Sequence, residues 1–251
     1  MSGHSKWSSI KHKKGAADAK RGQLFTKLSR AIIVAAKEGG PDPAGNLALQ
    51  NAIEKARSYS MPKDNIERAI AKGAGADAEA ASFETVLYEG YRPEGVAVLV
   101  EALTDNRNRT ASDVRHAFTK HGGNLGTIGA VAWQFERRGV VLVAAPGADE
   151  DELVLVAAEA GADDVELDGS SLVVTSAPES LTSVRQALEA AGFAIESVEL
   201  AMVPKTTVSV SDESTARRIM NLVDGLEESD DVQDVYANFD IPESVLEAVA
   251  S

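Results

Sequence analysis

The spacing of the apolar residues changes once along this chain, and that change limits the folds it can adopt. From about residue 16 to residue 73, apolar residues recur every three or four positions, as in helices that bury one face. After residue 78 they alternate or form short runs, which is typical of strands. The segment between them, Gly-Ala-Gly-Ala-Asp-Ala at 73–78, has the composition of a linker. The sequence therefore predicts a helical domain followed by an α+β region.

The helical part is predicted to hold three helices behind a basic arm. The first begins near Ala16 and ends at the Gly-Gly-Pro break of 39–41, and a second spans about 47–59. Pro62 favours the start of a third helix, which Gly73 closes. The apolar stripe of the first helix consists of Leu24, Leu28, Ala31, Ile32 and Ala35. We assign residues 1–76 to this domain.

The next segment begins a second domain. Residues 83–91 and 96–103 are strand-like and a four-residue turn separates them. A helix ending at Lys120 follows, with Asn108 or Thr110 as its N-cap, and 130–135 is predicted to be a third strand.

Residues 140–202 follow the order βαββαβ, which is that of a ferredoxin-like unit. The helix and strand predicted at 214–226 and 232–238 have no partners unless they return to the sheet that starts at Phe83. The predicted fold is therefore an α+β multidomain protein. It has an N-terminal three-helix domain plus two ferredoxin-like α+β domains, one inserted into the other. The domain spanning 80–136 plus 204–240 is discontinuous, and 137–203 is the insert.

Charge is divided unequally between these regions. Residues 1–72 hold 14 Lys and Arg against 6 Asp and Glu, a net charge of +8. The rest of the chain holds 11 against 33, a net charge of −22. A basic segment on an otherwise acidic protein indicates a module that binds a polyanion.

The face of the first helix that lies away from the apolar stripe should carry Lys20, Lys27, Arg30 and Lys37. A solvated helix face is the alternative explanation. The cationic cluster at 11–14 and Trp7, whose ring can stack on a base, favour nucleic acid instead. The predicted nucleic-acid-binding residues are Lys6, Trp7, Lys11, His12, Lys13, Lys14, Lys20, Arg21, Lys27 and Arg30.

A second, smaller contact is predicted in the α+β region. Arg107 and Arg109 lie in a polar segment between a strand and a helix, where helix capping explains only one or two of the side chains. The glycine-rich segment 122–129 lacks the ending of a phosphate-binding loop. It is either a long turn or a backbone surface that a phosphate or another chain approaches closely. The predicted second contact consists of Arg107, Arg109, Gly122, Gly123 and Gly126.

Other kinds of site have little support. The chain has no cysteine, which excludes disulfides, thiolate metal ligands and a cysteine nucleophile. Its four histidines form no His-Glu-x-x-His pair, and His116 and His121 are five residues apart. The acidic run at 227–231 lacks the ligand spacing of a calcium loop, so we interpret it as a solvated turn. We predict no metal, no cofactor and no enzymatic activity.

The apolar runs fall far short of the ~20 residues that span a membrane, and the first residues have no secretory apolar core. We therefore expect a cytoplasmic protein without a membrane partner.

Several blocks of the sequence resemble the YebC/PmpR family, which includes the mitochondrial translational activator of cytochrome c oxidase. The matching blocks are GHSKW at 3–7, IKHKK at 10–14, KRGQLFTKL at 20–28, MPKDNIERAI at 61–70, EGY at 89–91, LTDNRNRT at 103–110, GGNLG at 122–126 and DDVQDVY at 230–236. Two departures stand out. Residues 46–50 read Asn-Leu-Ala-Leu-Gln where the family tends to have Asn-Pro-Arg-Leu-Arg, and Ala130 replaces a serine.

The resemblance implies one helical and two α+β domains, and a non-enzymatic role in gene expression. Some members of the family are described as DNA-binding transcriptional regulators. Others are described as ribosome-associated translation factors that help with stretches such as consecutive prolines. The expected partner is therefore DNA, or ribosomal or transfer RNA with the ribosome. A protein–protein adaptor remains a third hypothesis, and the sequence does not settle the oligomeric state.

Overall fold

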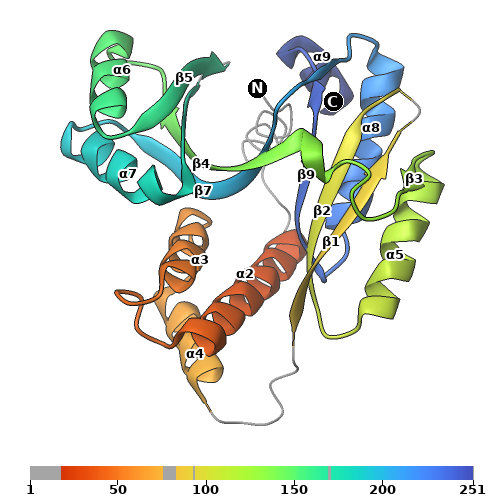
Figure 1. The fold of residues 1–251 in the computed structure, drawn as a ribbon, viewed down its shortest axis with the longest axis horizontal. Coiled ribbons are helices and arrows are strands. Elements are labelled where there is room, and N and C mark those ends of the chain that lie inside the picture. The colour runs from red at the N-terminus through yellow and green to blue at the C-terminus, as the bar shows by residue number, and fades with distance from the viewer. Residues whose placement is uncertain (1–17, 76–82, 93, 169–170, 251) are drawn as a thin grey trace.

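The computed structural model describes residues 18–75, 83–92, 94–168 and 171–250. The elements form a helical layer and two sheets, each sheet with its own covering helices (Figure 1). The protein is an α+β protein with an N-terminal helical region, as the sequence predicts.

The helical region consists of α2 (Asp18–Gly39), α3 (Leu47–Ser58) and α4 (Lys63–Ala74). Asn46 caps α3, because its Oδ1 accepts a hydrogen bond from the Leu49 N–H at 3.0 Å. Gly73 lets α4 approach α2 closely, since a Cβ there would lie 2.4 Å from the Ile33 carbonyl oxygen. Leu28, Ile32, Leu49, Ile53 and Ile66 belong to the buried core of this region.

The first sheet has the strand order β3-β1-β2-β9, and its neighbouring strands are antiparallel. Its strands are β1 (Glu84–Tyr91), β2 (Ala97–Thr104), β3 (Asn124–Leu125) and β9 (Val232–Ala237). Strand β9 therefore does return, late in the chain, to the sheet that β1 begins.

One face of this sheet is covered by α5 (Arg107–Lys120) and α8 (Glu213–Glu227). Val98 and Val100 of β2 pack there with Phe118 of α5 and Leu222 of α8. Before α8 lies the short strand β8 (Val208–Ser209), which pairs in parallel with β10 (Phe239–Asp240), and α9 (Glu243–Ala250) follows β10.

The second sheet has the order β5-β6-β4-β7, and its strands are antiparallel. It is built from β4 (Phe135–Ala144), α6 (Glu150–Glu159), β5 (Ala162–Asp168), β6 (Ser171–Ser176), α7 (Leu181–Ala190) and β7 (Ile195–Pro204). This is the predicted βαββαβ order. Leu153 of α6 and Val184 and Leu188 of α7 pack on Val141 and Val143 of β4.

Three local predictions were wrong. Residues 130–135 do not form a separate third strand, because a 3₁₀ turn (Ala132–Gln134) leads directly into β4, which begins at Phe135. Strand β4 then runs unbroken from Phe135 through the charged segment 136–138, paired with β7 as far as Pro204. The N-cap of α5 is Asn106, whose Oδ1 accepts from the Arg109 N–H at 3.1 Å, rather than Asn108 or Thr110.

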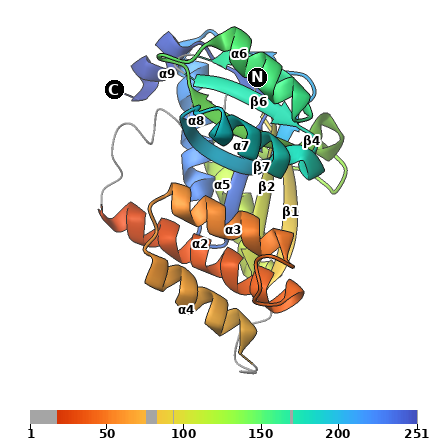
Figure 2. The ribbon, with the colours of Figure 1, turned by 90° about the vertical axis from the view of Figure 1, so that its left-hand side faces the viewer.

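Figure 2 shows the helical region as a separate layer, with α3 nearest to β7 of the second sheet. None of the described helices has the length and apolar character needed to cross a membrane.

Candidate nucleic-acid interface

The predicted interface is described only in part. Lys20 and Arg21 belong to the first turn of α2, but their side chains are outside the described part of the structure. The predicted residues that lie outside the described residues altogether are Lys6, Trp7, Lys11, His12, Lys13 and Lys14. The assignment of these residues to nucleic acid therefore stays a prediction.

Lys27 and Arg30 are described, and both contact another part of the same protein. The Lys27 ammonium is buried and donates a hydrogen bond to the Glu227 carbonyl oxygen at 2.6 Å. Arg30 Nη1 donates to the Asp230 carbonyl oxygen at 2.8 Å and pairs with Asp231 Oδ1 at 3.1 Å. This face of α2 is therefore turned towards the acidic segment 227–231.

Gln23 lies on the same face of α2 and adds to these contacts. Its Nε2 donates to the Glu228 carbonyl oxygen at 2.6 Å and to Asp230 Oδ1 at 2.9 Å. Helix α8 ends at Glu227, so its last carbonyl groups have no partner within the helix and carry the negative end of the helix dipole. We call the contacts of Gln23, Lys27 and Arg30 with residues 227–231 the α2 clasp.

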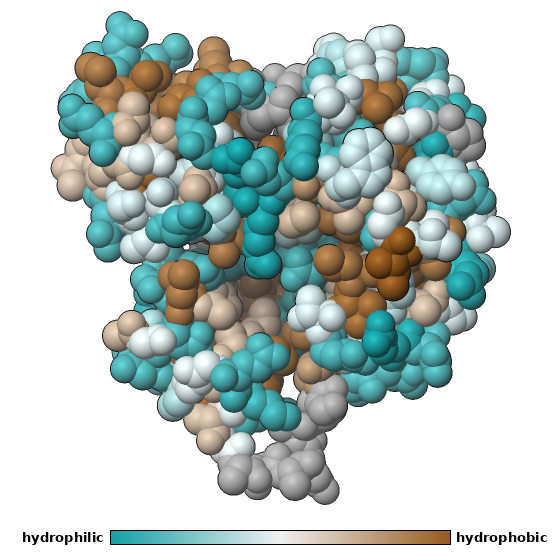
Figure 3. Space-filling model, in the orientation of Figure 1, coloured by the Kyte–Doolittle hydropathy of each residue, from teal (hydrophilic) through white to brown (hydrophobic). Residues whose placement is uncertain are grey.

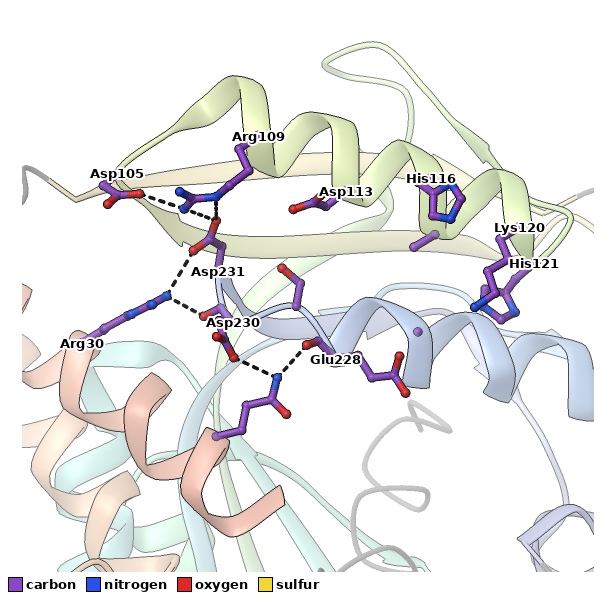
Figure 4. Close-up of a pocket in the computed structure, with 14 residues that line it drawn as sticks. Arg30, Asp105, Arg109, Asp113, His116, Lys120, His121, Glu228, Asp230 and Asp231 are labelled. Atoms are coloured by element: carbon purple, nitrogen blue, oxygen red, sulfur yellow. Dashed lines mark hydrogen bonds and ion pairs between the residues drawn. The ribbon is translucent and has the colours of Figure 1, made fainter. Parts of the chain in front are cut away.

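Asp231 is the centre of a buried polar network next to the clasp. Its Oδ2 accepts from Arg109 Nη2 at 2.7 Å and from the Thr110 hydroxyl at 2.8 Å, while Arg30 reaches its other oxygen (Figure 4). Burial alone would raise the pKa of Asp231, but these hydrogen bonds and the charges of Arg109 and Arg30 lower it below its ordinary value. The carboxylate is therefore held ionised between α2 and α5.

The prediction that 227–231 is simply a solvated turn was wrong. Asp231 is 5% exposed, and the segment receives side chains from α2 and α5. The acidic segment contacts a cationic helix face that lies about 200 residues earlier in the chain.

A cleft of about 710 Å³ opens between α2, α5 and the end of α8. Figure 4 shows Asp113, His116 and Lys120 along α5 on one side and Glu228 and Asp230 on the other. Carboxylates and cations alternate around it, so the cleft has no uniform charge that would select an anion. No group of three or more His, Cys, Asp and Glu side chains suited to a metal occurs in the described residues.

The second predicted contact has clear structural roles. Arg107 is exposed and lies 3.6 Å from Glu84. Arg109 also pairs with Asp105 at 2.8 Å, in addition to Asp231, and both partners raise its pKa. Their binding to nucleic acid is not tested by these contacts and stays a prediction.

The glycine-rich segment after α5 is held in one conformation by its neighbours. Gly122 has a φ of +75°, and a Cβ on Gly123 would lie 3.0 Å from the Phe118 ring. The Gly126 N–H donates to the Glu89 carbonyl oxygen at 2.7 Å. The long-turn interpretation thus explains each of the three glycines.

Glu89 fixes the rest of this segment. Its buried carboxylate accepts from the N–H groups of Gly129 and Val131, both at 2.7 Å, and Ala132 at 2.8 Å. Burial would raise the pKa of Glu89, but these three hydrogen bonds lower it. Within this segment Ile128 is 92% exposed and Trp133 is 68% exposed. Figure 3 shows a group of hydrophobic side chains on the face of the molecule on which β1 lies in Figure 1.

Several cations remain on the outer surface of the helical region, and sequence reasoning singled out only Lys37 among them. The exposed cations are Lys37, Arg57, Lys63, Arg68 and Lys72. The last four lie among acidic residues of similar number, so no run or period in the sequence marks them.

The comparisons with known proteins agree over nearly the whole chain. Residues 5–76 match the model of the TACO1/YebC protein N-terminal domain, and residues 83–239 match that of the TACO1/YebC second and third domain.

A protein of Rubrobacter xylanophilus is 61% identical over 250 residues, and one of Persephonella marina is 52% identical over 251 residues; both alignments cover all of each chain. Both proteins are named "Probable transcriptional regulatory protein". The crystal structure of a conserved hypothetical protein from Aquifex aeolicus is similar, with a TM-score of 0.80 and 52% identity. That similarity covers 90% of this chain and 92% of the other.

Proposed function

The chain belongs to the TACO1/YebC family, and from that premise we propose that it is a nucleic-acid-binding regulator of gene expression. The first candidate activity is that of a DNA-binding transcriptional regulatory protein that works in the cytoplasm and catalyses no reaction. The names of its relatives support the regulatory role.

The observation that carries the proposal is the division of charge between two separately built parts. The basic excess of +8 belongs to residues 1–72, and the acidic −22 belongs to the remainder. The helical region has a hydrophobic cluster of its own, so it is a distinct unit that can present its cations to a polyanion. The acidic sheets repel phosphates, which favours binding at the helical region and the arm.

A translation factor that binds ribosomal or transfer RNA is the second candidate. It is favoured by the composition of residues 6–30, which are dominated by Lys and Arg and contain one Gln and no Asn. Lysine contacts phosphates without reading bases, whereas a reader of the DNA major groove uses Asn, Gln or Arg at base edges.

Crosslinking the protein to nucleic acid in living cells, followed by sequencing of what is recovered, separates the two candidates. Reads concentrated at a few promoter regions support the transcriptional regulator. Reads dominated by ribosomal or transfer RNA support the translation factor. Recovery of proteins without nucleic acid contradicts the proposal and supports an adaptor.

A further inference from the structure

The face of α2 that the sequence assigns to nucleic acid is occupied by the protein's own acidic segment. Lys27 and Arg30 both contact residues 227–231 through the α2 clasp (Figure 4). The Lys27 ammonium is buried against Glu227, and Arg30 directs Nη1 at Asp230 and Asp231, so a phosphate can take these positions only by displacing the acidic segment. Nucleic acid and the acidic segment are therefore competitors for this face.

The interface between the helical region and the rest contains several charged side chains and no shared hydrophobic cluster among the described residues. The hydrophobic cluster of the helical region contains only residues 24–70, and the other clusters in the described part of the chain contain none of these. Hydrogen bonds and ion pairs join the two sides, and the Arg30 guanidinium also lies over the Phe83 ring, 5.5 Å from its centroid. Besides the clasp, Lys55 pairs with Asp234 at 2.6 Å, and Glu54 pairs with Arg185 at 3.3 Å. An interface of this kind is weakened by salt and allows relative movement.

The clasp also determines how much positive charge the helical region exposes. Residues 22–72 contain 8 Lys and Arg and 5 Asp and Glu. Three of these cations, Lys27, Arg30 and Lys55, are engaged with residues of the segment 227–234. Glu54 is engaged with Arg185 in the same way, so five cations and four acids remain, and the described surface of the helical region is close to neutral while the clasp is closed.

We propose that the α2 clasp is an autoinhibitory contact: residues 227–231 mimic the phosphates of a nucleic acid, and a bound polyanion displaces them from Lys27 and Arg30. This inference rests on the proposed function, because it assumes that the polyanion is nucleic acid. Opening the clasp frees both cations and turns a near-neutral helix face into a basic one. Binding to the basic arm and opening of the clasp then reinforce each other.

The test uses a charge reversal on the acidic side of the clasp. Asp230→Lys places a cation opposite Gln23 and Arg30 at an exposed position, so the fold should persist. Asp113→Lys is the matched control, because Asp113 lines the same cleft and has no hydrogen bond or ion pair to the described part of α2. Both variants change the net charge equally, so their difference isolates the clasp from general attraction.

Binding of a 20-base-pair DNA duplex and of an RNA of equal length is measured by fluorescence anisotropy. We expect Asp230→Lys to bind whichever of the two ligands the wild type prefers about tenfold more tightly than Asp113→Lys does. The reason is that the fraction of molecules with an open clasp limits the apparent affinity. Equal affinities of the two variants would overturn the inference.

Opening is measured directly by pulsed electron spin resonance on the full chain. The chain has no native cysteine, so Ala71→Cys on α4 and Ser112→Cys on α5 accept spin labels at two exposed positions only. We expect the distance between the labels to lengthen when the nucleic acid saturates the protein, and also in Asp230→Lys without ligand.

If nucleic acid binds and the distance between the two spin labels stays unchanged, the autoinhibitory role of the α2 clasp is overturned and the proposed function is left intact. If neither the wild type nor Asp230→Lys binds DNA or RNA, the proposed function is overturned together with the inference that rests on it.

Discussion

Replacing Glu89 by Gln tests whether one buried carboxylate fixes the segment after α5. The two oxygens of Glu89 accept three backbone N–H groups, two at 2.7 Å and one at 2.8 Å. In the variant, the amide oxygen can accept hydrogen bonds from the N–H groups of Val131 and Ala132. The NH₂ group then faces the Gly129 N–H, and no hydrogen bond forms between these two donors. One charge-assisted hydrogen bond is lost and two become neutral.

A hydrogen bond to a charged group contributes about 1.5–3 kcal/mol, and a neutral one about 1 kcal/mol. Because Gly129 is exposed and water can replace part of the loss, we expect Glu89→Gln to lower the free energy of unfolding by about 2–4 kcal/mol. Urea unfolding at pH 7, followed by circular dichroism, measures the difference. Amide hydrogen exchange of residues 124–134 reports the local effect separately.

The effect should depend on pH in a direction that the pKa fixes. The pKa of Glu89 is lowered in the folded protein, so its stabilisation is complete above the unfolded value of about 4.3 and is lost as the pH falls through the folded value. The difference between the wild type and Glu89→Gln should therefore shrink below about pH 4.

Glu84→Gln is the matched control on the same strand. Glu84 is exposed and has a 3.6 Å ion pair with Arg107, so its replacement should change stability by less than about 0.5 kcal/mol. A loss at Glu89 as small as that at Glu84, or one that persists unchanged at pH 3, would refute this account of the segment.

Two further predictions follow from close contacts elsewhere. Gly73→Ala adds a methyl group 2.4 Å from the Ile33 carbonyl oxygen, so it should destabilise the helical region by about 1–3 kcal/mol in urea unfolding. Gly22→Ala is the control: a Cβ there has no neighbour within 4 Å, and the change should not destabilise the region. Burial, with the charges of Lys120 and Arg92, lowers the pKa of His121, so the unfolded chain binds a proton at this histidine more readily than the folded protein does. The urea midpoint of unfolding should therefore fall as the pH drops below about 6.5. His121→Gln should reduce this dependence of the midpoint on pH, and an unchanged dependence would contradict the assignment.

The sequence predicts the elements that bury one regular face. Helix α2 is visible because Leu28 and Ile32 continue a stripe of constant spacing, and β2 because 97–104 is an almost unbroken apolar run. Strand β3 cannot be predicted because it has only two residues, too few to show an alternation of apolar and polar residues. It is held in place next to the hydrogen bond from the Gly126 N–H to the Glu89 carbonyl oxygen. The continuity of β4 escapes it because Glu-Arg-Arg at 136–138 interrupts the apolar alternation.

The candidate interface divides in the same way. The basic arm stands out in composition, but the partners of Lys27 and Arg30 lie about 200 residues further along the chain. Local patterns carry no information about such distant pairs. An acidic run that is solvated and one that receives a cationic helix have the same sequence, so only the structure reveals the α2 clasp.

The most direct test of the proposed function is the salt dependence of nucleic-acid binding by an arm variant. Lys11, Lys13 and Lys14 are replaced together by Gln, and the same change at Lys37, Lys63 and Lys72 is the control with equal charge. Affinity for labelled duplex DNA and for RNA is measured by anisotropy over a range of NaCl concentrations.

If the arm binds phosphates, each lost contact lowers the log–log slope by about 0.7–0.9, so the arm variant should lose about 2–3 units and the control much less. Equal slopes for the two variants, or a wild-type protein that binds neither DNA nor RNA at low salt, would contradict the account.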